Sequence, residues 1–268
     1  MQYALETLNW LVEAGADETI GEVPVNRLQA KNAAPTPLPE RPRDAAPSVS
    51  KPAAATTNAG GDGVGDAQAL AAAATTLAEL KSAMENFEGC ALKRTASNTV
   101  FADGTPTGRV MFIGEAPGRD EDRIGKPFVG RAGQLLDKML ASIGLDRNVN
   151  AYITNVINWR PPENRDPSPE EAAMCLPFLR RHIELADPGV IVLLGAVAAR
   201  HVMGVSEGIM KSRGRWMEYR VGDRMVPVMP TLHPAYLLRQ PAHKKLAWRD
   251  LQSLAARMEE LELPAAAK

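Results

Sequence analysis

The segment from Gly114 to Gly133 has the composition of a loop that holds a small molecule against its backbone. It begins Gly-Glu-Ala-Pro-Gly and ends Gly-Lys-Pro-Phe-Val-Gly-Arg-Ala-Gly. Glycine lets a backbone approach a ligand closely and adopt positive φ. Phe128 lies inside this loop and outside any helical stripe, so its ring could stack on a base. The loop matches neither the G-x-x-x-x-G-K-[ST] nor the G-x-G-x-x-G phosphate-binding pattern.

Two polar side chains further along the chain follow apolar runs. Asn155 ends one run, and His233 comes shortly after another, in Thr-Leu-His-Pro-Ala-Tyr. An asparagine amide both donates and accepts hydrogen bonds, and so does a neutral imidazole. Taken singly, each residue is more often a structural group at a strand end. No metal-ligand spacing is found among the other histidines, which are His182, His201 and His243.

The elements that must position these side chains alternate in type after Gly108. Short apolar runs predict buried strands at Val110–Ile113, Tyr152–Asn155, Val190–Leu194 and Val226–Met229. Helical patterns lie at Ala132–Ile143, Pro169–Leu185, Ala196–Met203 and Lys244–Leu261. This alternation predicts an α/β fold with three layers and a central four-stranded parallel sheet. Ligands bind such sheets at the carboxyl ends of the strands, which is where the polar residues occur.

The N-terminal third predicts a different organisation. Residues 1–29 contain Leu5, Leu8, Leu11 and Val12 at helical spacing, which predicts a short helix. Residues 30–66 are rich in alanine and proline and are expected to form a flexible, disordered linker. An Ala/Leu-rich helix is predicted over Ala67–Phe87. The catalytic domain is therefore expected to comprise residues 67–268.

Composition narrows the class of protein. The chain has 268 residues, two cysteines and no apolar run long enough to span a bilayer. We therefore expect a cytoplasmic protein with reduced thiols and no membrane partner. Residues 105–268 carry 23 Lys and Arg against 19 Asp and Glu, whereas residues 1–104 carry 8 against 13. A mildly basic second part is compatible with a polyanionic partner.

The ordered set of motifs is far more specific than any single one. GEAPG, RIGKPFVGRAG, TN, RPPENR, RGRW and TLHPAYLLR follow one another between about Cys90 and Leu254. In this order they closely resemble the uracil-DNA glycosylase superfamily, and within it the family-4, or iron–sulfur, type. The resemblance implies an enzyme of base-excision repair that flips uracil out of DNA and hydrolyses its N-glycosidic bond. A four-stranded parallel sheet between helices is the fold it implies.

The resemblance also implies roles for individual residues. Gly114, Glu115 and Ala116 would line the uracil pocket, and Phe128 would stack on the flipped base. Asn155 would read the edge of the base, and His233 would donate to the uracil O2 as negative charge develops there. Ala116 stands where the best-known uracil-DNA glycosylases have a water-activating aspartate, so Glu115 and Asp120 become candidates for that task. The expected DNA contacts are Leu237 or Leu238 as a wedge, with Arg239, Lys211, Arg213 and Arg215 on phosphates.

The chain departs from the resembled family at its iron–sulfur site. Cys90 matches the first of the family's four cluster cysteines and Cys175 the fourth, but Lys93 and Trp159 occupy the second and third positions. Neither side chain is a cluster ligand. We therefore expect the protein to have no iron–sulfur cluster and no other cofactor.

Two alternative functions stay open at the level of sequence. One is a uracil-DNA-binding protein with little turnover; a relative of that kind carries a basic, histidine-containing insertion that is missing from the segment Asn155–Cys175. The other is a glycosylase that also accepts other deaminated or alkylated bases. The expected partner is uracil-containing DNA, and the expected state is a monomer whose N-terminal helix could bind another protein.

Overall fold

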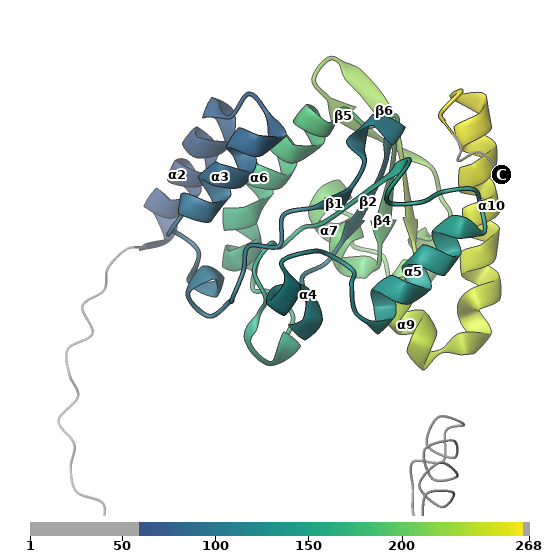
Figure 1. The fold of residues 1–268 in the computed structure, drawn as a ribbon, viewed down its shortest axis with the longest axis horizontal. Coiled ribbons are helices and arrows are strands. Elements are labelled where there is room, and N and C mark those ends of the chain that lie inside the picture. Colours follow the sequence, from purple (N-terminus) through teal and green to yellow (C-terminus); the bar gives the residue numbers. More distant parts are fainter. Residues whose placement is uncertain (1–58, 265–268) are drawn as a thin grey trace, which may run out of the picture. The chain divides into compact units, whose positions relative to one another are not determined.

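The computed structural model describes residues 59–264, and the predicted helix within residues 1–29 lies outside this range. A six-stranded sheet forms its centre, with the order β1-β3-β2-β4-β6-β5 (Figure 1). The strands are β1 (Asp103–Gly104), β2 (Val110–Gly114), β3 (Ala151–Asn155), β4 (Val190–Leu194), β5 (Met217–Val221) and β6 (Arg224–Thr231). The four predicted strands pair in parallel as β3-β2-β4-β6. The prediction of a central parallel sheet is confirmed, and β1 and β5 add an antiparallel strand at each edge.

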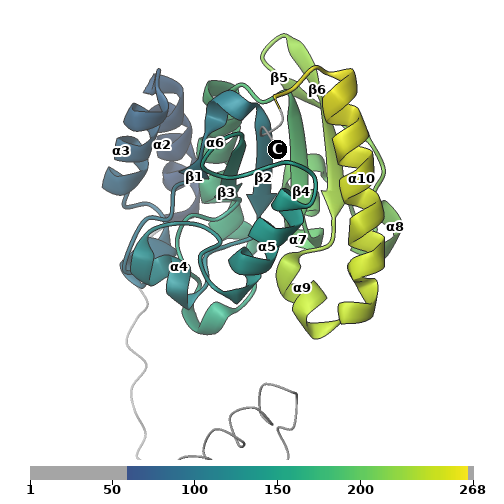
Figure 2. The ribbon, with the colours of Figure 1, turned by 45° about the vertical axis from the view of Figure 1, so that its right-hand side comes forward.

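Alternate residues of the buried strands face opposite helical layers, as expected for a sheet covered on both sides. Val110 and Phe112 of β2 pack in a cluster with side chains of α5 (Arg131–Ala141) and α10 (Lys244–Glu260). Met111 and Ile113 pack in another cluster with α6 (Pro169–Ala186) and α7 (Ala196–Met203). Figure 2 shows α10 and α5 on one side of the sheet and α6 on the other. The three-layer α/β/α prediction is therefore confirmed.

The predicted helix at 67–87 is two helices in the structure, namely α2 (Ala59–Ala73) and α3 (Leu77–Asn86). The side chain of Thr76 accepts a hydrogen bond from the Glu79 N–H, so a helix N-cap interrupts the alanine-rich run. The start of α2 at Ala59 also corrects the end of the predicted linker, because residues 59–66 are helical. The remainder of the predicted linker, residues 30–58, lies outside the described residues. Both helices pack beside α6 (Figure 1).

Besides four 3-10 turns, residues 59–264 contain three short α-helices. They are α4 (Arg119–Ile124), α8 (Ile209–Ser212) and α9 (Pro234–Arg239). Helix α4 follows β2 and α9 follows β6, so both begin beyond the carboxyl ends of parallel strands, at the same end of the sheet (Figure 2). None of the helices within residues 59–264 has the length and apolar character needed to cross a membrane.

Candidate active site

A small, mainly apolar cavity of about 180 Å³ lies where β2, β3 and β6 end. The carboxyl ends of these strands converge as the parallel pairing requires. Its lining comes from the loop after β2, the end of β3 and the start of α9. The lining residues are Ala116, Gly118, Glu121, Phe128, Ala132, Asn155, His233 and Ala235. The structure thus brings together four residues that the sequence analysis assigned to the base: Ala116, Phe128, Asn155 and His233.

The ring of Phe128 is held in the cavity by an uncommon backbone conformation. Phe128 has φ +53°, in the left-handed region that bulky residues rarely adopt. Its ring lies so close to Gly114 that a Cβ on that glycine would come within 2.6 Å of ring carbons. A Cβ on Gly133 would come within 1.8 Å of the Phe128 carbonyl oxygen. Both glycines are therefore needed so that this loop can fold over the end of β2.

Asn155 ends β3 with its side chain buried. Its Oδ1 is the one buried side-chain oxygen or nitrogen in the described part of the chain without a hydrogen-bond partner. Leaving a buried polar atom unpaired costs about 1–3 kcal/mol, so such atoms are rare and call for a functional explanation. The amide belongs to the cavity wall, which is where a ligand could complete its hydrogen bonds.

His233 has a defined tautomer in the neutral state. Its Nδ1 accepts a hydrogen bond from the Ala235 N–H at 3.1 Å, so the proton of the neutral ring lies on Nε2. Burial, with a smaller contribution from the positive charge of Arg239, lowers the pKa of His233 to about 4. The ring centroids of His233 and Phe128 are 5.5 Å apart. The cavity therefore offers an aromatic face, an amide and an imidazole N–H donor.

Gly195, directly after β4, leaves room for the side chain of His233 at the end of β6. It has φ +97°, and a Cβ at this position would approach the His233 Cβ to 3.2 Å. Its N–H donates to the Thr231 carbonyl at 2.9 Å, which ties the end of β4 to the end of β6. A glycine is therefore required at position 195 by both its backbone conformation and its contact with His233.

Glu121 is a site residue that the sequence analysis missed, because Asp120, Glu121 and Asp122 have the composition of a solvated charge run. In the structure Glu121 accepts hydrogen bonds from the N–H groups of Gly118, Val129 and Gly130 at 2.9–3.1 Å. Asp122 is buried and accepts from the N–H groups of Ser97 and Asn98. No sequence pattern links Glu121 to residues 129 and 130. Its hydrogen bonds to their N–H groups can therefore be recognised only in the folded loop.

Glu115 adjoins the cavity but is not among its lining residues. Its backbone carbonyl accepts from the Ile157 N–H at 3.0 Å, which continues the β2–β3 pairing. Burial and the nearby Asp166 carboxylate raise the pKa of Glu115, and Arg200 opposes them. Asp120, the other candidate for activating water, is exposed and lies 3.8 Å from Arg123 in an ion pair.

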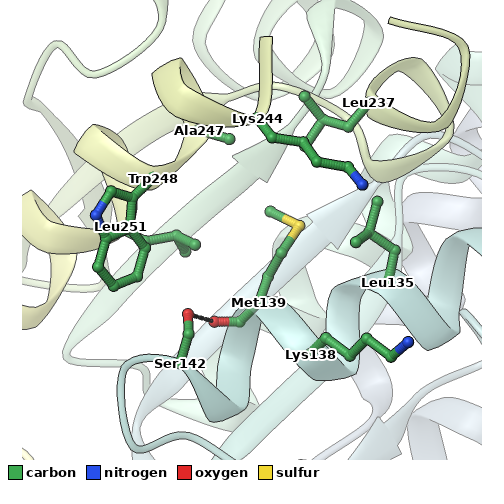
Figure 3. Close-up of a pocket in the computed structure, with 9 residues that line it drawn as sticks. All are labelled: Leu135, Lys138, Met139, Ser142, Leu237, Lys244, Ala247, Trp248 and Leu251. Carbon is green, nitrogen blue, oxygen red and sulfur yellow. Dashed lines mark hydrogen bonds between the residues drawn. The ribbon is translucent and has the colours of Figure 1, made fainter. Parts of the chain in front are cut away.

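Two of the residues predicted to contact DNA are engaged inside the protein in this structure. Leu237 is 1% exposed and packs with Met139 and Leu251, and Figure 3 shows it lining an apolar groove between α5 and α10. Arg213 is enclosed by an ion pair with Asp250 and by a hydrogen bond to the Leu246 carbonyl. Both side chains contact α10 residues, which favours Leu238 over Leu237 as the candidate wedge.

The other predicted DNA contacts are exposed. Leu238 is 38% exposed and Arg239 follows it on α9, which begins at the cavity. Lys211 lies on α8 and Arg215 after it, beside β6, and Arg215 pairs with Glu207 at 3.3 Å. Leu238 and Arg239 thus lie on the helix that begins at the cavity, whereas Lys211 lies on α8 and Arg215 in the segment that follows it.

The positions that resemble iron–sulfur ligands do not suit a cluster. Cys90 and Cys175 are buried, and hydrogen bonding to Cys175 lowers the pKa of the Cys90 thiol to about 7 although burial opposes this shift. Lys93 donates through Nζ to the Glu85 carbonyl and to Glu88. Trp159 is fully buried, with its Nε1 donating to the Thr99 hydroxyl at 3.0 Å. Four ligands cannot be assembled from these side chains.

Comparison with known proteins agrees with this geometry. Residues 101–252 match the Uracil DNA glycosylase superfamily, and the chain belongs to it. A type-4 uracil-DNA glycosylase of Thermotoga maritima is 44% identical over 166 residues, which cover 61% of this chain and 84% of the relative. One of Archaeoglobus fulgidus is 45% identical over 156 residues, covering 57% and 78%. A type-5 uracil-DNA glycosylase of Pyrobaculum aerophilum is 35% identical over 116 residues, covering 38% and 51%.

Proposed function

We propose that the protein is a uracil-DNA glycosylase that takes a flipped uracil into the cavity between Phe128, Asn155 and His233. The observation that carries this assignment is the unpaired, buried Oδ1 of Asn155 in a cavity with an aromatic wall. A uracil edge offers an imide N–H to an amide oxygen and a carbonyl to an amide N–H. Membership of the superfamily and the names of the type-4 relatives support the same activity.

His233 supplies electrostatic stabilisation in this proposal. As the N-glycosidic bond breaks, the leaving uracil gains negative charge, and a positioned donor near O2 stabilises that charge. A neutral imidazole with its proton on Nε2 is such a donor, and the lowered pKa keeps it neutral at working pH. Glu115, with its raised pKa, stays our candidate for activating the attacking water. Ala116 presents only a methyl group to the cavity.

We propose that DNA approaches along α9. Leu238 is an exposed apolar side chain on the helix that begins at the cavity; it takes the role of the wedge, and Arg239 contacts a phosphate. The enzyme acts in the cytoplasm as a monomer in this proposal, and its two cysteines there stay reduced. Lys211 and Arg215 contribute at most to weak, salt-dependent attraction.

We also propose that the protein works without an iron–sulfur cluster. The hydrogen bonds of Lys93 and the complete burial of Trp159 support this, because the side chains at two of the four ligand positions have no thiolate and are engaged in the protein's own packing. Protein purified without oxygen should contain neither stoichiometric iron nor acid-labile sulfide. Stoichiometric amounts of both would show that other residues complete a cluster.

Turnover separates this proposal from a protein that only captures uracil in DNA. A uracil-containing oligonucleotide in tenfold excess over protein is incubated, and free uracil is measured by chromatography. We expect many molecules of uracil for each protein molecule. Release that stops at or below one uracil per protein would favour capture without turnover.

A further inference from the structure

Arg147 belongs to the connection between α5 and β3. Its guanidinium contacts the loop that carries Phe128. Its side chain is only 12% exposed. It donates to the Phe128 carbonyl at 2.8 Å and to the Pro127 carbonyl at 3.2 Å. These two bonds join the loop that forms the cavity to a segment that otherwise has no part in the site.

Two carboxylates fix the guanidinium in this position. Arg147 pairs with Asp103 at 3.0 Å and with Asp137 at 2.6 Å. Burial would raise the pKa of Asp103, but hydrogen bonds from Lys126 and Arg147 hold that pKa below its usual value. A rigid, planar donor with five N–H groups can satisfy two carboxylates and two carbonyls at once, which a lysine cannot do.

The conformation of Phe128 needs such support. A bulky residue in the left-handed region is strained by about 1–3 kcal/mol, and strain of this kind persists only where surrounding contacts impose it. Glu121 holds the chain after Phe128 through the N–H groups of Val129 and Gly130. Arg147 is the charged group that holds the carbonyl of Phe128 itself.

We propose that Arg147 is a positioning residue that holds Phe128 in its strained conformation and so places the stacking ring in the base cavity. Arg147 does not touch the base and acts only through Phe128. The inference builds on the proposed uracil site. It predicts that loss of Arg147 weakens recognition of the base and leaves contacts to the DNA backbone unchanged.

The test is a double-mutant cycle on single-turnover excision of uracil from an oligonucleotide. We expect Arg147→Gln to lower the rate on the order of tenfold, the size of one lost charge-assisted hydrogen bond. Phe128→Leu removes the ring and should lower the rate at least as much. In the Phe128→Leu background, Arg147→Gln should then have little further effect, because the ring that it positions is gone.

A matched control and a second readout exclude a merely structural role. Arg181 also donates to a loop carbonyl, that of Ala74, and pairs with Glu184, but it lies on α6. Arg181→Gln removes a similar type of contact far from the cavity and should leave excision unchanged. Binding of DNA with a tetrahydrofuran abasic site, which has no base to stack, should be equal in wild type and Arg147→Gln.

Several outcomes would overturn the inference. They are additive effects in the cycle, equal losses on abasic and uracil DNA, or an Arg147→Gln rate equal to that of Arg181→Gln. If Arg147→Gln does not fold, Arg147→Lys keeps the charge but not the fork, and the same cycle applies to it. A wild-type protein that excises no uracil would contradict the proposed function instead, so the two failures are distinguishable.

Discussion

His233 combines two tasks in one side chain. Its Nδ1 caps α9 by accepting from the Ala235 N–H, and this bond leaves the Nε2 proton available to the cavity. A histidine with a purely structural role would need only the hydrogen bond from the Ala235 N–H to Nδ1. The two tasks can therefore be separated by substitutions that keep or remove the cap.

We predict that His233→Ala lowers the single-turnover rate of uracil excision by about 10²–10³, the usual effect of removing one donor to a developing anion. Binding of uracil DNA should change little. His233→Asn offers another good cap residue but not the imidazole donor, so it should lose a similar rate and keep more of the melting temperature. A near-normal rate in folded His233→Ala would mean that the histidine only caps the helix.

Sequence alone could predict three of the side chains that line the cavity. Phe128, Asn155 and His233 stand out as an aromatic in a glycine loop and as polar groups after apolar runs, but only the ordered set of motifs assigns them to the base. Glu121 and Arg147 could not be found in this way. They act on backbone groups that come near them only when the loop folds back with Phe128 at positive φ.

At the scale of the element, α9 carries two adjacent leucines with opposite surroundings. Leu237 faces the groove between α5 and α10 (Figure 3), and Leu238 faces outward. Sequence could not choose between them, because a helix of six residues is too short for its buried face to show as a pattern. Trp248 on α10 illustrates the same difficulty, because this large apolar residue is 43% exposed at the groove.

We predict opposite effects for the two leucines. Leu237→Ala should lower the free energy of unfolding by about 2–5 kcal/mol, as for other buried leucines, and spare the rate of the folded fraction. Leu238→Ala should change stability by less than about 0.5 kcal/mol and reduce excision from double-stranded DNA. Urea unfolding and single-turnover rates of both variants check this. If Leu238→Ala excised uracil from double-stranded DNA as fast as folded Leu237→Ala, Leu238 would be excluded as the wedge.

The helices and strands around the site were predictable where the pattern was periodic and bounded. The four central strands and α5, α6, α7 and α10 lie within a few residues of their predicted positions. The break between α2 and α3 was not predicted, since alanine favours helix on both sides and the interruption comes from the Thr76 cap. β1 and β5 lack a buried run of their own and exist as edge partners of β3 and β6.

At the scale of the whole molecule, two buried histidines make stability depend on pH. Burial lowers the pKa of His182 to about 3, and His182 lies 2.9 Å from the Tyr152 hydroxyl. The pKa of His233 is lowered to about 4. The unfolded chain takes up these protons near pH 6.5 and the folded chain does not, so stability present above pH 6.5 is lost as the pH falls toward 4.

We predict that the free energy of unfolding decreases by up to about 1.4 kcal/mol per pH unit for each histidine between pH 6 and pH 4. Urea titrations at several pH values measure this slope. His182→Gln should reduce the slope by the contribution of one proton. An unchanged slope in that variant would mean that His182 is protonated in the folded protein.

The central claim is that the cavity between Phe128, Asn155 and His233 accepts uracil from DNA for excision. Its most direct test uses two end-labelled oligonucleotides that differ only in one uracil or thymine, each incubated with the protein and then treated with alkali. The account predicts a strand break at the uracil and none at the thymine. Folded protein that leaves the uracil strand without an abasic site would contradict it.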